Sequence, residues 1–289
     1  MPAAHILLAI LVSAVYGTAF VAIKLAVTEL PPLLVTGYRY LLAAVPLVFF
    51  VPVPQVPVRH LVAYGLTQGV VMFGLIFTAI RLGMPPGLAS LVVQMQVFFT
   101  IFLSAPLFGE RPRQREIAGA VVAMAGICLI GFADSGITPV VPFLMVIASA
   151  AAWGCANLIA KAAKPKAMLG FVGWSSLAAP VPLFLLSMLF EGTAFGLPDH
   201  LPSPTAMASI AFLAYPTTVF AFAAWVFLLH SHPAATVTPF ALLIPVFGMA
   251  STAVAFGETL TPLAAAGSLL VFAGLAVNVF GNPWHRKRS

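Results

Sequence analysis

Two groups of residues have the types and the spacing to line a path for a small organic solute. Their members are Tyr16, Phe20 and Lys24 and, 137 residues later, Trp153, Asn157 and Lys161. Intervals of four place each group on one face of a helix. Aromatic rings can stack on a solute and the Asn157 carboxamide can hydrogen-bond it. The alternative is that the side chains pack within the protein or, for the rings, lie at a membrane interface.

Three glutamines lie within apolar runs, at Gln68, Gln94 and Gln96. A carboxamide that faces lipid costs several kcal/mol, so each should face a partner or a water-filled space. On a helix, Gln94 and Gln96 point about 200° apart and should not line one wall together. Substrate contact and interhelical hydrogen bonding both remain open for them. Met72, Phe73, Tyr215, Thr218 and Phe222 are further candidates, with plain packing as the alternative. The predicted substrate-binding residues are Tyr16, Phe20, Gln68, Met72, Phe73, Gln94, Trp153, Asn157, Tyr215 and Phe222.

Charged residues offer less chemistry. Arg39 lies deep in an apolar run, where it could neutralise a substrate carboxylate, but we favour a structural ion pair. Lys24 could attract a carboxylate or pair with Glu29, whereas Lys161 can extend toward the membrane surface. His230 and His232 supply at most two metal ligands, too few for a zinc site. With no H-E-x-x-H motif, Ser–His–acid set or pair of intramembrane aspartates, the sequence predicts no catalytic group, metal or cofactor.

The elements that position these residues are membrane-spanning helices. The chain is 62% hydrophobic and 7% charged, whereas soluble domains carry about 25% charged residues. A spanning helix needs about 20 apolar residues. The net charge of +6 forms no dense basic patch, which argues against a nucleic-acid partner. Lipid is the predicted solvent, and nothing in the sequence is incompatible with a monomer. Ten segments qualify as spans, at residues 5–26, 32–52, 59–81, 85–108, 113–132, 139–162, 167–190, 205–230, 233–256 and 261–281.

Lysine and arginine positions predict the orientation, because cytoplasmic connections are enriched in these residues. With the N-terminus inside, the outer connections hold one basic residue, Arg81, together with several acids. The inner connections then hold Arg59, Arg111, Arg113, Arg115, Lys164, Lys166, Arg286, Lys287 and Arg288. Both termini should therefore face the cytoplasm.

The chain also repeats itself. Phe108-Gly-Glu110 recurs as Phe256-Gly-Glu258, and the Gly119/Gly126 pair recurs as Gly267/Gly274. These glycines should allow close approach of two helices in lipid. The predicted halves are residues 1–136 and 137–289. Five spans per half is an odd number, so the second half should be inverted relative to the first. Inverted repeats are typical of transporters, with the substrate between the halves near the midplane.

The run Pro86-Gly-Leu-Ala-Ser90, followed by Phe108-Gly-Glu-Arg111 and then Gly119 and Gly126, resembles the EamA repeat of the drug/metabolite transporter superfamily. The second copy, from Pro233-Ala-Ala-Thr-Val237 to Gly274, departs at Thr259, which stands where the first has Arg111. The resemblance implies an all-α integral membrane protein of ten transmembrane helices, built as two inverted five-helix repeats. Among its members the chain looks most like bacterial amino-acid exporters of the YddG type, which implies a location in the bacterial inner membrane.

The expected function is export of small metabolites, in particular amino acids and among them aromatic or other bulky apolar ones, by alternating access through a central cavity. One alternative is efflux of drugs or cationic metabolites. Two others are an integral membrane enzyme that modifies lipids and a sensor or chaperone that does not transport. Every acid lies at or beyond the end of a predicted helix. A cation exchanger usually needs an intramembrane acid, so drug extrusion driven by a buried carboxylate is not expected.

Overall fold

A computed structural model describes residues 1–109, 114–133, 139–232 and 237–280 of the chain. Within these ranges every secondary-structure element is a helix, and no strand element forms. The elements are α1 (Ala3–Glu29), α2 (Pro32–Phe50), α3 (Val58–Gly65), η1 (Leu66–Phe73), α4 (Gly74–Arg81), α5 (Pro86–Val92), η2 (Val93–Met95), α6 (Gln96–Phe108), α7 (Gln114–Ala133), α8 (Val140–Ala163), α9 (Met168–Ser176), α10 (Pro180–Phe190), α11 (Pro204–Phe212), η3 (Leu213–Ala221), α12 (Phe222–Ser231), η4 (Thr238–Leu242), α14 (Leu243–Phe256) and α15 (Pro262–Phe280).

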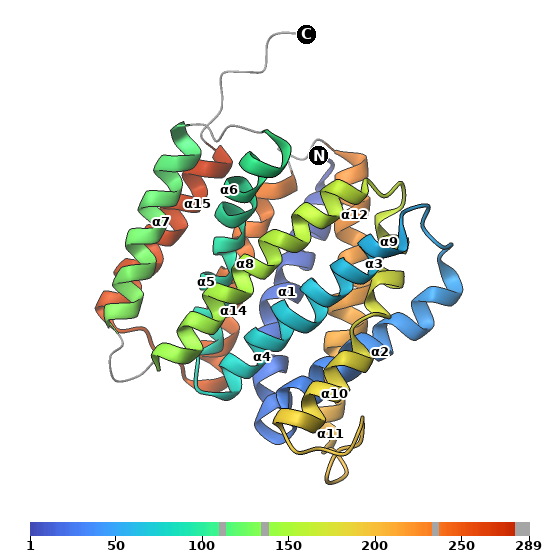
Figure 1. The fold of residues 1–289 in the computed structure, drawn as a ribbon. Coiled ribbons are helices and arrows are strands. Elements are labelled where there is room, and N and C mark those ends of the chain that lie inside the picture. The colour runs from blue at the N-terminus through green and yellow to red at the C-terminus, as the bar shows by residue number, and fades with distance from the viewer. Residues whose placement is uncertain (110–113, 134–138, 233–236, 281–289) are drawn as a thin grey trace.

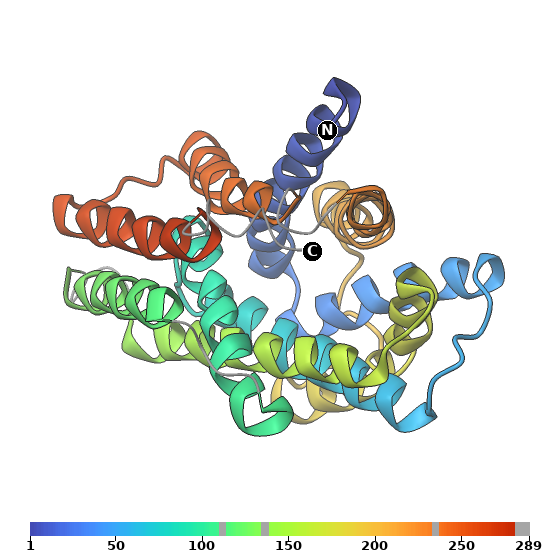
Figure 2. The ribbon, with the colours of Figure 1, turned by 90° about the horizontal axis from the view of Figure 1, so that it is seen from above.

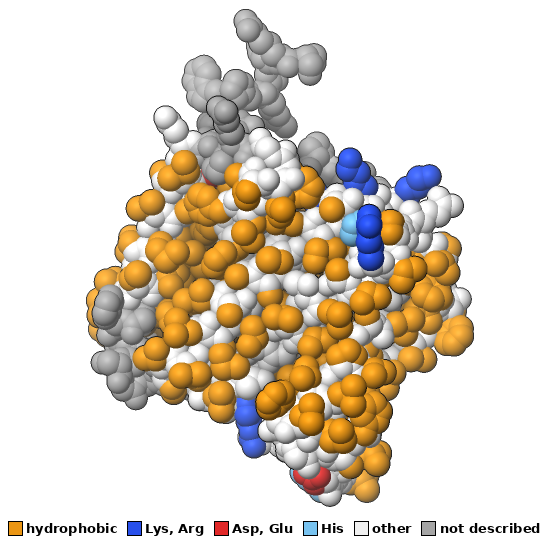
Figure 3. Space-filling view, in the orientation of Figure 1, with side chains coloured by type: hydrophobic (Ala, Val, Ile, Leu, Met, Phe, Trp, Pro, Cys, Tyr) orange, Lys and Arg blue, Asp and Glu red, His pale blue; other side chains and the backbone are white. Residues whose placement is uncertain are grey.

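These elements form the ten predicted segments. Several join end to end, so that α3, η1 and α4 make one rod over Val58–Arg81 and α5, η2 and α6 make another over Pro86–Phe108. Among the described residues seven helices have the length and hydropathy of a membrane span, and two shorter apolar helices follow near the C-terminus. Figure 3 shows a broad hydrophobic face with charged side chains near its two ends, as lipid contact requires. The prediction of an all-α membrane protein is confirmed.

The two halves run in opposite directions and pack alike. In Figure 1, α1 descends from the N-terminus while α8 ascends. Gly17 of α1 faces α14, where an added Cβ would lie 2.6 Å from the Phe247 Cβ; Gly154 of α8 faces α6, where it would lie 2.8 Å from the Phe99 Cβ. Phe99 and Phe247 are 148 residues apart, the spacing of the Phe-Gly-Glu motif. The predicted boundary after residue 136 lies outside the described residues.

Glycines hold α7 against α15 at one edge of the molecule, where both views show the two helices side by side (Figures 1 and 2). A Cβ at Gly126 would lie 2.5 Å from the Gly267 carbonyl oxygen, and one at Gly267 would lie 2.7 Å from the Gly126 carbonyl oxygen. Gly274 lies equally close to the backbone of Gly119. The predicted packing role of these four glycines is therefore confirmed.

Helical irregularities also occur in pairs. The wide, π-helical turns of η1 and η3 begin 147 residues apart (213 − 66), and the tight 3-10 turns of η2 and η4 occupy corresponding places in their halves. Such interruptions are rare in ordinary helices and are frequent at functional sites. Broken helices that meet between inverted repeats are the usual setting of a transporter's binding site.

The two ends of the bundle differ. At the end where α1 finishes, α1 packs on α4 and α5, and Arg81 Nη1 donates to the Thr28 carbonyl oxygen at 2.5 Å. In the inverted second half, the counterparts of α1, α4 and α5 are α8, α12 and residues 234–240, and 234–236 lie outside the described residues. No packing of comparable extent joins α8 to α12 in the described part of the chain. The bundle is therefore closed at the Glu29 end and more open at the His5 end.

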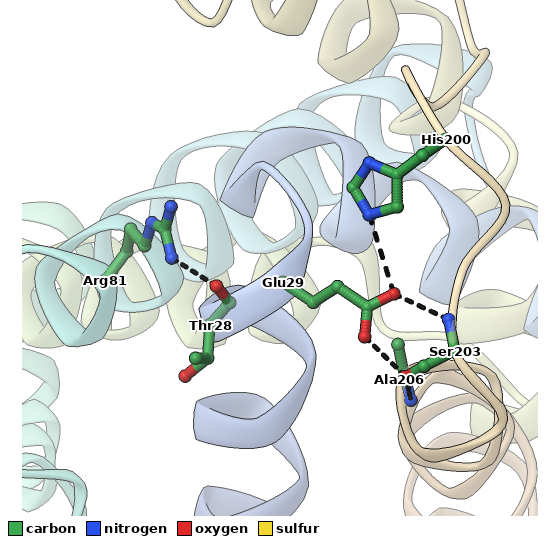
Figure 4. A network of polar contacts seen from close by, with 6 residues as sticks. All are labelled: Thr28, Glu29, Arg81, His200, Ser203 and Ala206. Carbon is green, nitrogen blue, oxygen red and sulfur yellow. Dashed lines mark hydrogen bonds and ion pairs between the residues drawn. The ribbon is translucent and has the colours of Figure 1, made fainter.

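The long connection from 191 to 203 reinforces the closed end (Figure 4). The Glu29 carboxylate accepts hydrogen bonds from the Ser203 backbone N–H at 2.6 Å and from the Ser203 hydroxyl, and His200 Nε2 lies 3.7 Å away. Glu191 accepts from the Leu33 N–H at 2.9 Å and so caps the start of α2. Glu29 is thus held by the connection, in place of the pairing with Lys24 that the sequence suggested. This connection ties the second half over the α1–α2 turn of the first.

Candidate functional site

A buried arginine contacts both of the π-helical segments. Arg39 projects from α2 and is only 5% exposed. Its guanidinium carbon lies 3.9 Å from the centroid of the Phe73 ring, which belongs to η1 in the first half. Its Nε donates to Thr218 Oγ1 at 3.2 Å, and Thr218 belongs to η3 in the second half. Arg39 therefore contacts both halves at their irregular segments.

Hydroxyl groups stabilise the widened turns that present these residues. Pro216 lies inside η3 and supplies no N–H to the turn. The Thr218 hydroxyl donates to the Leu213 carbonyl oxygen at 2.8 Å, and the Thr217 hydroxyl donates to that of Phe212 at 3.1 Å. On the other side the Ser149 hydroxyl donates to the Met72 carbonyl oxygen at 2.8 Å. Carbonyls that a regular helix would satisfy are thus paired, and Thr218 is left to accept from Arg39.

Arg39 has no carboxylate partner within ion-pair distance in the described part of the chain. The structural ion pair that we favoured from the sequence is therefore not found. Its charge is instead surrounded by rings, because Phe77 and Tyr40 also lie within 6.0 Å of the guanidinium carbon. The sequence shows that Arg39 lies deep in an apolar run. Only the packing of the helices shows that no described acid lies within ion-pair distance of it.

Two predicted site residues lie beside this arginine. Phe73 covers its face. Tyr16 is half-buried against Ala221 and is close enough to Arg39 for an electrostatic interaction. The structure thus brings Tyr16 and Phe73 together with two residues outside the predicted set of ten, Arg39 and Thr218. Phe222 is half-buried at the start of α12, against a different cluster that contains Phe171.

Other predicted residues lie elsewhere. Phe20 and Met72 are buried in the largest apolar cluster, and Trp153 is half-buried against it. Tyr215, at 44% exposed, is the most exposed of the ten. A groove of about 1020 Å³ lies between α1, α11 and α14 and is lined by none of the ten. A smaller pocket of about 340 Å³ lies at the closed end, between Glu29 and Arg81.

The glutamines have different surroundings. Gln96 accepts from the Asn157 Nδ2 at 2.8 Å, and Thr100 Oγ1 accepts from the same nitrogen at 3.0 Å. Gln94 is 5% exposed, and its Nε2 is buried with no hydrogen-bond partner in the described chain. Gln68 is half-buried, with a similarly unpaired buried Oε1. Asn157 and Gln96 therefore join α8 to α6, whereas Gln68 and Gln94 retain hydrogen-bonding capacity.

We expect Asn157→Ala to weaken the α8–α6 contact and to leave substrate selectivity unchanged. Interhelical hydrogen bonds within membranes are worth about 0.6 kcal/mol on average and up to about 1.7 kcal/mol. The melting temperature in detergent should fall modestly, and transport of all substrates should change by a common factor. Asn157→Gln is the matched variant that keeps the carboxamide. A change in the ratio of two substrates' transport rates in Asn157→Ala would show that Asn157 contacts substrate, as the sequence analysis proposed.

Comparison with known proteins agrees with this architecture. A probable amino-acid metabolite efflux pump of Salmonella typhimurium is 40% identical, over 95% of this chain and 94% of that protein. The Escherichia coli protein of the same description is 38% identical, over 96% of each. A solved crystal structure shares the fold, with a TM-score of 0.66 and 20% identity over 97% of this chain and 99% of the other. The model of the EamA-like transporter family matches residues 3–132 and 141–280, and the chain belongs to that family.

Proposed function

We propose that this chain exports amino acids, including aromatic or other bulky apolar ones, by alternating access between residues 1–136 and 137–289. The observation that carries the proposal is the position of Arg39, between the π-helical segments of the two halves. A solute bound there would contact both halves, so their relative movement could expose it to either side. The two relatives described as amino-acid metabolite efflux pumps support this substrate class.

The direction follows from the asymmetry of the bundle. The Lys/Arg distribution favours a cytoplasmic His5 end and an outer Glu29 end. The closed Glu29 end and the more open His5 end then correspond to a conformation that faces the cytoplasm. An exporter loads its substrate in this conformation.

The rival functions have weaker support. A carrier that exchanges cations for protons usually needs an acid within the membrane. The described acids, Glu29, Glu116, Glu191, Asp199 and Glu258, lie at helix ends or in connections. Membership of a transporter family favours transport over lipid modification. We therefore propose that the chain has no enzymatic role.

Purified protein in liposomes tests the function. Vesicles preloaded with unlabelled phenylalanine should accumulate labelled phenylalanine by counterflow, and those preloaded with a cationic dye should not. Empty liposomes and liposomes with a heat-denatured sample are the controls. Counterflow of the dye without counterflow of any amino acid would replace amino-acid export with the drug-efflux alternative.

The orientation has a separate test. We expect a reporter enzyme that is active only outside the cytoplasm to work when it is inserted in the connection from 191 to 203. The same reporter should be inactive at Ser289. The physical reason is the excess of Lys and Arg in the connections assigned to the cytoplasm. The reverse pattern of activity would overturn the assigned topology and with it the direction of transport.

A further inference from the structure

We infer that Arg39 binds the carboxylate of the transported solute and that the site requires this carboxylate but not the solute's ammonium group. The inference rests on the proposed transport function and adds the chemical class of substrate to it. The class is a monocarboxylate with an apolar body, with or without an α-amino group.

The positive charge of Arg39 is buried and needs a counter-charge. Arginine remains protonated in proteins, and a buried charge is costly unless it is paired and hydrogen-bonded. Arg39 is 5% exposed, yet the described residues give it one hydrogen bond, to Thr218 Oγ1, and no acid. A cation–π contact with Phe73 offsets part of the cost. A full counter-charge must come from outside the described chain, and a bound anion supplies it.

The guanidinium group of Arg39 has a geometry that suits a carboxylate. Thr218 takes the Nε–H, and the Phe73 ring covers one face of the guanidinium plane. The Nη1 and Nη2 groups form no hydrogen bond with any described residue. Two parallel N–H groups on a planar cation match the two oxygens of a carboxylate. Because one fixed cation balances one negative charge, a monocarboxylate fits better than a dianion.

The ammonium group of an amino acid gains little from this site. A zwitterion brings a positive charge into a site that already holds Arg39, and the described acids all lie at helix ends or in connections. Gln68 belongs to the same segment, η1, as Phe73, and its Oε1 is buried with no hydrogen-bond partner among the described residues. If the ammonium group reaches this oxygen, a neutral acceptor can hydrogen-bond it without neutralising it. The site can therefore tolerate the α-amino group but gains little from it. An amine without a carboxylate should be rejected by Arg39.

Three ligands that share one phenyl ring separate these contributions: phenylalanine, hydrocinnamate, which lacks the amino group, and phenethylamine, which lacks the carboxylate. We expect the first two to raise the melting temperature of the full-length protein in detergent and to compete for counterflow of labelled phenylalanine. Phenethylamine should do neither. Arg39→Gln should weaken both carboxylates by about 10- to 100-fold, which corresponds to the loss of charge-assisted hydrogen bonds.

Two further variants keep the test decisive. Arg39→Lys keeps the charge without the planar fork and should bind carboxylates with intermediate strength. Arg59→Gln removes an exposed arginine at the start of α3 and is the matched control, with unchanged ligand effects. Without ligand, Arg39→Gln should melt no lower than the wild type, because it removes an unpaired buried charge. A purely structural arginine would instead give lower stability with unchanged relative affinities.

The outcomes separate this inference from the proposed function. If phenylalanine is transported but phenethylamine binds equally well, or if Arg39→Gln binds carboxylates like the wild type, the carboxylate site is wrong and transport stands. If carboxylates stabilise the wild type and not Arg39→Gln, but no amino acid shows counterflow, the site stands and amino-acid transport is wrong. If no carboxylate either binds or is transported, both are overturned.

Discussion

Replacing Gly126 by leucine should separate α7 from α15 and lower the melting temperature in detergent by a large margin. The Cβ alone would lie 2.5 Å from the Gly267 carbonyl oxygen and 2.8 Å from the Val271 backbone nitrogen. These are backbone atoms and cannot move aside as a flexible side chain does. Overpacking typically costs about 1–3 kcal/mol and occasionally more. Lipid supplies no hydrophobic force that would hold the helices together after the contact is lost.

Ala125→Leu is the matched control for this prediction. Ala125 is the preceding residue on α7, and its side chain is exposed. The same side chain added there should leave the melting temperature nearly unchanged. Equal melting temperatures for the two variants would show that the close glycine contact does not hold α7 and α15 together.

Most of the fold follows from patterns that are local in the sequence. Apolar runs of spanning length predict the helices, and the recurrence of Phe108-Gly-Glu110 at Phe256 predicts the second half. The irregular turns are less predictable. Pro216 explains why a regular helix is interrupted in η3, but the matching segment η1 contains no proline. Its widened turns depend on contacts with other helices, such as the Ser149 hydroxyl bond to the Met72 carbonyl.

The site follows from the sequence less completely, because its residues come from different helices. Phe73 is predicted from its type and position, and its ring lies against Arg39. The sequence favours an ion pair for Arg39, because the distance from Arg39 to each acid depends on how the helices pack. The sequence leaves open which of Gln94 and Gln96 is free to meet a solute, and only the packed helices show that Gln96 accepts a hydrogen bond from Asn157. Contacts between residues that are distant in the sequence determine which polar side chains remain free to bind a solute.

The repeated aromatic residues Tyr16 and Trp153 show how equivalent positions acquire different neighbours. Tyr16 packs against Ala221 and Ala224 of the second half. Trp153 is half-buried against the largest apolar cluster, which contains residues of both halves, among them Met72 and Ile210. Tyr16 thus lies at the boundary between the halves, and Trp153 belongs to α8, which packs against α6 of the first half. Rings at this boundary should be sensitive to the relative movement that alternating access requires.

Trp153→Ala tests whether the exposed part of that ring meets substrate. The ring is half-buried, so we expect a smaller loss of stability than the roughly 3–5 kcal/mol of a fully buried aromatic residue. Aromatic contacts are worth about 0.5–1.5 kcal/mol beyond area burial. Transport of a bulky amino acid should therefore fall several-fold, while transport of a small one falls less. The measurements are counterflow of phenylalanine and alanine and the melting temperature in detergent.

Phe171→Ala provides the comparison, because Phe171 has no exposed surface and packs against Tyr64 at a ring-centroid distance of 4.9 Å. Its truncation should cost the full stability of a buried ring and reduce transport of both amino acids by the same factor. If Trp153→Ala behaves in this way, Trp153 is a packing residue and does not contact substrate. If it changes the ratio of the two transport rates while keeping most of the stability, the ring lies on the substrate path between the two halves.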